Sequence, residues 1–155
     1  MQNLKMKTFM SGIVNVVVLL FVIRIAAAGA ILSVPLAQVK WEPISGMPKG
    51  FFTAILREEP TTKAHDRLIK VHAGGVVPRH WHTANEAVVV VKGTFRLAGA
   101  DGKMTALMPG DYAYIPAKSI HEGTCGGKGG CLMSLSIDGA FDLNVVDKQG
   151  NPVKP

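Results

Sequence analysis

The feature that most constrains the fold is the repeated interruption of short apolar runs by Gly and Pro along the chain after residue 37. These breaks recur roughly every 8–12 residues, the spacing typical of an all-β sandwich or barrel. The run Glu86–Lys92 contains four consecutive valines, which predicts a strand covered on both faces. No segment after residue 37 keeps the 3.6-residue period of an amphipathic helix. The sequence therefore predicts an all-β fold.

Residues 1–37 are expected to form a leader and residues 38–155 a single domain. Lys5 and Lys7 precede an apolar run from Phe9 to Ile23, and small residues follow, which is typical of a signal peptide. The run is also open to interpretation as an uncleaved membrane anchor, for which it is short, or as a buried helix. The first two interpretations predict a periplasmic or secreted domain, or one anchored to the membrane and facing outward.

Composition sets aside one class of partner. The chain has 48% hydrophobic and 18% charged residues, as expected of a globular protein. Its net charge of +6 includes three positive charges in the first 30 residues, which leaves 6 − 3 = +3 for the remainder. No Lys/Arg run accompanies that charge, so we expect no nucleic-acid partner. We expect membrane contact only if the leader is uncleaved.

Four residues form the candidate site: His80, His82, Glu86 and His121. The first three share even parity, so on an extended strand they face the same side. Imidazole nitrogens with one carboxylate suit one divalent transition metal (Mn, Fe, Ni, Zn or Cu), and the set is too rich in nitrogen for Ca or Mg. The alternative is that His80 and His82 are surface histidines in a loop before a strand.

Glycines and a proline surround these residues at fixed spacings, and the pattern resembles the two sequence motifs of the cupin superfamily. The matched positions are Gly74, His80, His82, Glu86 and Gly93 in the first motif, and Gly110, Pro116 and His121 in the second. Two positions depart from the second motif: Lys118 replaces a Gly, which leaves its tight left-handed turn in doubt, and Cys125 replaces an Asn. The resemblance implies a jelly-roll β-barrel that binds metal through the four candidate residues.

The resemblance also implies a range of functions. The first is a metal-dependent enzyme that acts on a small organic substrate, with dioxygenase-type chemistry foremost and catalytic residues unknown. The second is a non-catalytic module that binds or senses a metal or small molecule. A cytoplasmic regulator that binds a sigma factor is the third, and the predicted export argues against it. Small members usually pair through sheet edges, so we expect a homodimer.

Cys125 and Cys131 flank a Gly-rich pentapeptide that predicts a flexible turn. In the oxidising compartment that the leader indicates, such a short loop is easily closed by a disulfide. Two alternatives stay open, namely a pair of free thiols or a role for Cys125 near the metal.

The remaining candidates have plainer interpretations. His65 lies in a polar turn and is expected to be solvated, and His72 shares its strand face with Lys70 and is expected to face solvent. Arg79 is a candidate rim cation for an acidic substrate. Side chains expected in the core or the pocket lining are Phe95, Leu97, Met133, Leu135, Tyr112 and Tyr114.

Overall fold

The computed structural model describes residues 31–153, and Val34–Pro155 form one compact unit. Strands account for about half of that unit, after a 3-10 helix (η1) at Leu36–Gln38. The strands are β1 (Glu42–Pro43), β2 (Phe51–Glu58), β3 (His65–Val71), β4 (Val76–Trp81), β5 (Glu86–Lys92), β6 (Thr94–Gly99), β7 (Met104–Leu107), β8 (Tyr112–Ile115), β9 (His121–Gly126), β10 (Cys131–Ile137) and β11 (Asn144–Val145). Their alternation with Gly- and Pro-containing turns is the pattern expected from the sequence.

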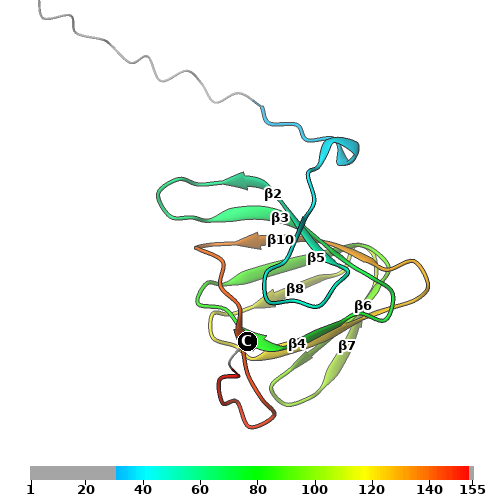
Figure 1. Ribbon diagram of the computed structural model, residues 1–155, viewed down its shortest axis with the longest axis vertical. Helices are drawn as coiled ribbons and strands as arrows, with labels where there is room; N and C mark the ends of the chain where they lie inside the picture. The colour runs from blue at the N-terminus through cyan, green and yellow to red at the C-terminus, as the bar shows by residue number, and fades with distance from the viewer. Residues whose placement is uncertain (1–30, 154–155) are drawn as a thin grey trace, which may run out of the picture. The chain divides into compact units, whose positions relative to one another are not determined.

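Two antiparallel sheets face each other and enclose the core (Figure 1). The first sheet has the order β1-β2-β3-β10-β5-β8 and the second has the order β11-β4-β9-β6-β7. Because β10 lies between β3 and β5, the chain returns across the sheet instead of forming consecutive hairpins. The predicted jelly-roll β-barrel is therefore confirmed.

The core consists of the side chains that alternate inward along each strand. In β3 every second residue from His65 to Val71 is buried, and the residues between them face outward. The same alternation runs through β9 and β10. Inward-facing side chains from both sheets meet in one apolar cluster that includes Val71, Val90 and Phe95.

One face of the six-stranded sheet is open to solvent, contrary to expectation. Val89 and Val91 on β5 are 37% and 48% exposed, so the prediction that this strand is covered on both faces is wrong. Tyr112 and Tyr114 on β8 are 60% and 55% exposed, and neither lies in the core or the pocket. Because strand side chains alternate, these four residues share the outer face, with no described element packed over them.

The disulfide between Cys125 and Cys131 is confirmed, with a Cα–Cα distance of 5.7 Å. It joins the end of β9 to the start of β10 at the end of the barrel where both sulfurs are buried. Gly93 lies against this bridge, because a Cβ at residue 93 would stand 2.4 Å from the carbonyl oxygen of Gly130. A glycine is therefore required there for the close approach of the two backbones.

Lys118 adopts the left-handed conformation that a glycine would favour, with a φ of 64°. Its backbone N–H donates a hydrogen bond to the carbonyl oxygen of His82 at 2.7 Å. The turn that the sequence left in doubt therefore forms despite the β-carbon, at a cost of about 1 kcal/mol.

The predicted leader cannot be compared with the structure, because residues 1–30 lie outside the described residues. Within residues 31–153 no helix is long and apolar enough to cross a membrane. The signal peptide and the boundary at residue 37 stay predictions.

Candidate metal centre

Three strands bring the predicted residues together inside one end of the barrel. His80, near the end of β4, lies opposite His121, the first residue of β9, in the antiparallel register. His82 follows β4 by one residue, and Glu86 opens β5. All four side chains are buried, with exposed fractions from 4% to 6%. The alternative of surface histidines in a loop is therefore wrong.

The imidazole nitrogens converge on one point. The Nε2 atoms of His80 and His82 lie 3.0 Å apart, and the ring centroids of His80 and His121 lie 4.1 Å apart. One nitrogen from each of the three rings lies within 4.8 Å of the others, a spacing suited to a shared metal ion. Glu86 Oε2 lies 3.0 Å from His82 Nε2 on the same side.

Backbone carbonyls fix which nitrogen of each ring faces inward. The Nδ1 atoms of His80 and His121 lie 2.7 and 2.9 Å from the carbonyl oxygens of Pro78 and Ser119. His82 Nδ1 pairs in the same way with the carbonyl oxygen of Asp142. A carbonyl only accepts hydrogen bonds, so each neutral ring carries its proton on Nδ1 and presents a free lone pair on Nε2.

The protonation preferences of the histidines agree with this arrangement. Burial and the two neighbouring imidazoles lower the pKa of His80 to about 3, and burial also lowers the pKa of His121. Burial lowers the pKa of His82 too, but the adjacent Glu86 carboxylate outweighs it and leaves that pKa above its usual value. At neutral pH His80 and His121 are therefore neutral and able to bind a metal.

A small apolar cavity of about 70 Å³ opens beside the four residues. Its walls include Phe95, Leu97, Met133 and Leu135, which confirms their predicted place in the lining. By this measure the cavity has room for roughly five water molecules or a ligand of a few heavy atoms. The histidines and Glu86 line one side, so a ligand in the cavity would touch them directly.

The segment between β10 and β11 completes the site, and sequence reasoning missed it. Asp142 accepts a hydrogen bond from the Thr83 N–H at 2.8 Å, while its carbonyl oxygen holds His82. Phe141 packs on the His82 ring with 5.2 Å between centroids and lines the cavity. At the start of the segment Asp138 accepts two hydrogen bonds from Asn85. These contacts join residues more than 50 positions apart, which no local motif reveals.

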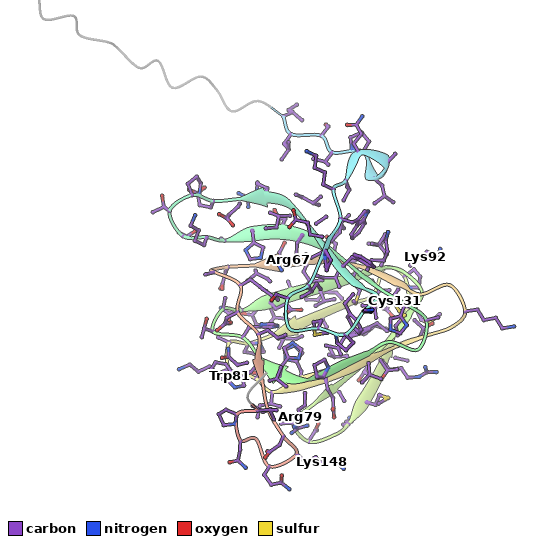
Figure 2. All side chains as sticks on the ribbon, in the orientation of Figure 1. Arg67, Arg79, Trp81, Lys92, Cys131 and Lys148 are labelled. Atoms are coloured by element: carbon purple, nitrogen blue, oxygen red, sulfur yellow. A yellow bond between two sulfur atoms is a disulfide. The ribbon has the colours of Figure 1, made fainter. Side chains whose placement is uncertain are left out.

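The other candidate residues divide between confirmed and wrong predictions. His72 is exposed as expected, whereas His65 is only 3% exposed, so its predicted solvation is wrong. Arg79 lies in the five-stranded sheet (Figure 2), where it donates to the carbonyl oxygen of Ala100 at 3.1 Å and lies 3.6 Å from Glu122. It does not line the cavity, so the interpretation of Arg79 as a rim cation is wrong.

Arg67 is a second residue that sequence reasoning missed. It is 5% exposed and faces the barrel interior from β3. Ile69 and Val71 are predicted to face inward because side chains alternate along a strand. The same alternation, continued backward along the strand, would have predicted that Arg67 and His65 also face inward.

Comparison with known proteins agrees with the motifs. The sequence model of the cupin domain family matches residues 67–138. The DNA damage-repair/toleration protein DRT102 of Arabidopsis thaliana is 35% identical over 84 residues, which are 54% of this chain and 26% of that protein. This chain therefore spans about a quarter of the length of that relative.

Solved structures show the same architecture. An RmlC-like cupin from Shewanella frigidimarina superposes with a TM-score of 0.56 at 23% identity, over 70% of this chain and 92% of the other. A putative acetylacetone dioxygenase from Methylibium petroleiphilum superposes with a TM-score of 0.62 at 19% identity, over 83% of this chain and 89% of the other. At these identities the likeness establishes the fold and leaves the reaction open.

Proposed function

Because this chain belongs to the cupin superfamily, we propose that it binds one divalent transition metal (Mn, Fe, Ni, Zn or Cu) and acts as a metal-dependent enzyme on a small organic substrate. The observation that carries the proposal is the convergence of three Nε2 lone pairs beside a buried carboxylate at an apolar cavity. Dioxygenase-type chemistry is the first candidate reaction, supported only by the resemblance to a putative dioxygenase.

In this proposal Glu86 is the fourth ligand. Its buried Oε2 lies 3.0 Å from His82 Nε2, a contact that is an ion pair only when His82 is protonated, and it has no other polar partner among the described residues. A buried carboxylate without a partner is costly, and a cation at this point would compensate its charge. The ligand role of Glu86 rests on the position of this oxygen beside His82 Nε2, since the three imidazoles alone meet the distances of a metal site.

Each group has a part in the proposed chemistry. A bound metal would supply Lewis acidity or redox capacity and positions open to exchange. The three histidines would hold the metal, and a hydrogen bond to a backbone carbonyl oxygen fixes each ring. Glu86 would offset one unit of the positive charge of the metal. The apolar walls exclude water from the substrate and strengthen electrostatic interactions inside the cavity.

The metal part of the proposal is tested by elemental analysis after reconstitution with each of the five metals. We expect about one ion per chain in the wild type, and we expect His121→Ala to bind at least ~10-fold more weakly, since a ligand is lost. His72→Ala is the matched control, because this exposed histidine lies outside the site. Substoichiometric metal in every reconstituted wild-type sample would end the proposal.

The enzyme part is tested by oxygen uptake and product analysis with catechols, flavonols, thiols, oxalate and diketones. Turnover should disappear in Glu86→Gln, which keeps the shape of the side chain and removes its charge. Metal binding with ligand-induced stabilisation but no turnover in any metal form would favour the non-catalytic binding module instead.

We also propose that the protein is exported and forms a homodimer. The leader-like residues 1–37 and the Cys125–Cys131 disulfide support export. The outer-face patch of Val89, Val91, Tyr112 and Tyr114 beside the edge strand β8 supports pairing with a second copy. Cell fractionation with intact-mass analysis tests export. Light scattering of wild type and Tyr114→Lys tests pairing, and a monomeric wild type at tens of micromolar would contradict it.

A further inference from the structure

A groove of about 610 Å³ lies at the disulfide end of the barrel, apart from the metal centre. This volume falls in the range of roughly 300–1,000 Å³ that is usual for sites of organic ligands. No residue lines both the groove and the cavity beside the histidines. In Figure 2, Lys92 of the groove is labelled beside Cys131, on the side of the barrel away from Trp81. The side chains that define the groove are Trp41, Phe52, Lys70, Lys92, Lys128 and Leu132.

Strand register aligns four of these side chains in one row across the six-stranded sheet. Phe52 of β2 lies opposite Lys70 of β3. Lys70 lies opposite Leu132 of β10, which in turn lies opposite Lys92 of β5. Directly opposed residues project from the same face of a sheet, and this face is the outer one because both lysines are exposed. The row therefore places two apolar side chains between and beside two ammonium groups, on strands about 10 Å apart.

Three lysines give the groove its charge. The ammonium nitrogen of Lys70 lies 4.1 Å from the centre of the Trp41 ring. Lys92 reaches the Gly-rich loop between the two cysteines, because a Cβ at Gly129 would lie 3.9 Å from its Nζ. Lys128 is the neighbouring residue in that loop. Since the disulfide holds both ends of the loop, Lys128 stays close to Lys92.

The three ammonium groups have no carboxylate partner among residues 31–153. No carboxylate oxygen lies within 4.0 Å of any of them, and no Asp or Glu lines the groove. Two other surface grooves differ in this respect. Arg79 shares one of them with Glu122, and Arg57 shares the other with Asp66. The uncompensated positive charge of the lysine groove therefore indicates an anionic ligand.

The residue types of the groove indicate which anion fits. Lysine presents a compact charge with rotatable donors and is a common phosphate ligand, whereas the planar fork of arginine suits a carboxylate. A phosphate monoester carries about −1.5 to −2 charge at pH 7, enough to balance most of the charge of the three lysines. The apolar side chains of Phe52 and Leu132 lie between and beside these charges and can cover a hydrocarbon or aromatic group.

We propose that this groove is a second binding site, and that its ligand is a phosphate monoester of an apolar or aromatic group. The phosphate binds between Lys92 and Lys128. The apolar group rests on Leu132 and Phe52 and extends toward the Trp41 ring. The proposal does not depend on the proposed function, because the groove and the metal centre share no residue. The protein would thus hold a phosphorylated ligand while the cavity beside the histidines stays free for its own.

Calorimetric titration of the full chain with naphthyl phosphate tests the site. Lys92→Gln/Lys128→Gln should bind at least ~10-fold more weakly than the wild type, since two charge-assisted hydrogen bonds are lost. Lys103→Gln/Lys148→Gln is the matched control. It removes the same charge from exposed positions outside the groove and should keep the wild-type affinity. Absence of binding to the wild type, or equal weakening in the two double variants, would overturn the proposal.

Further titrations separate the parts of the ligand and its source. Leu132→Thr removes the apolar floor and should weaken naphthyl phosphate by ~5-fold while inorganic phosphate binds as before. Unchanged affinity for naphthyl phosphate would overturn the apolar part of the site. His121→Ala should bind both probes normally, and a loss would place the phosphate at the metal centre and overturn the proposal. Short-chain phosphatidic acid below its micelle concentration is the last probe. Tighter binding than naphthyl phosphate would indicate a lipid ligand, and weaker binding a soluble ester, and both results uphold the site.

Discussion

The two ends of the barrel interior differ in chemistry, although the same strands build both. The polar end holds His65 and Arg67 of β3, Glu86 of β5 and His121 of β9. The opposite end holds Val71 of β3, Val90 of β5 and Cys125 of β9, which are exposed by 0%, 1% and 0%. In Figure 2, Trp81, which lies between His80 and His82 in the sequence, and Cys131 of the disulfide are labelled on opposite sides of the barrel.

The difference shows how a small barrel accommodates a polar site in its interior. The polar end contains unpaired buried atoms of His65, Arg67 and Glu86, each of which opposes folding. The disulfide end contains complete apolar burial and a covalent bridge, both of which favour folding. We infer that the disulfide end stabilises the fold on which the polar end depends.

The largest expected effect on stability comes from truncating the apolar end. Val71→Ala removes two methyl groups from a fully buried side chain and should lower the free energy of unfolding by about 2–3 kcal/mol. Denaturant titration of the metal-free protein measures this loss. Metal affinity should be unchanged, because Val71 does not line the cavity. A large loss of metal affinity in the folded variant would show that the two ends are not independent.

Removing the disulfide should have the next largest effect. The double variant Cys125→Ala/Cys131→Ala opens a loop with a sequence separation of 6 and should lower the free energy of unfolding by about 2 kcal/mol. Thermal unfolding with and without reductant checks the change, since reductant should destabilise the wild type and leave the double variant unaffected. If the wild type and the double variant are equally stable, the disulfide does not stabilise the fold.

Acid should destabilise the polar end of the metal-free protein. The pKa of folded His80 is about 3, below its value of 6.5 in an unfolded chain, so the unfolded state binds more protons as the pH falls below 6.5. Stability is then lost by about 1–2 kcal/mol between pH 7 and pH 5. The lowered pKa of His121 adds to this loss, while the raised pKa of His82 opposes it.

Denaturant titration across this pH range measures the effect. His80→Asn should flatten the profile, and His72→Asn should leave it unchanged because His72 is exposed. A profile that is flat in the wild type would contradict the burial of neutral histidines.

The smallest expected effect concerns the turn at Lys118. Its left-handed φ of 64° is relieved in Lys118→Gly, which should raise the free energy of unfolding by about 0.5–1 kcal/mol. Lys63 has a φ of 63° outside the metal centre, and Lys63→Gly is the matched control with a similar gain. Metal affinity should be unchanged in both variants, because glycine keeps the backbone N–H that donates to the carbonyl oxygen of His82. Lower stability in Lys118→Gly would mean that the lysine side chain contributes more than its backbone strain costs.

Local patterns were sufficient for the all-β fold and, with the family resemblance, for the four residues that the structure buries together at the candidate site. Strand parity placed His80, His82 and Glu86 on one side, and the resemblance to the second cupin motif added His121. Parity and turn positions are properties of a few neighbouring residues, whereas the link to His121, 35 positions after Glu86, depends on the family motif. The disulfide was predictable from neighbouring residues, since a short Gly-rich loop joins its two cysteines.

Patterns were insufficient where burial depends on distant segments. A run of valines looks the same in the sequence whether the outer face of the strand is covered or exposed, so the exposure of Val89 and Val91 on β5 could not be predicted. His65 follows a polar turn, which suggests solvent, yet Phe141 packs against it from another part of the chain. Asp142 belongs to the site only because its segment returns to His82 after the barrel has closed.

The contact between His82 and Asp142 also sets an order of events in the life of the protein. The two residues are 60 positions apart, so a nascent chain that has emerged only as far as β9 lacks the carbonyl that orients His82. The site acquires its full set of oriented ligands only after the last strands have joined the sheets. In the proposed function, metal binding therefore follows folding, and the ions available where folding ends would determine which metal occupies the site.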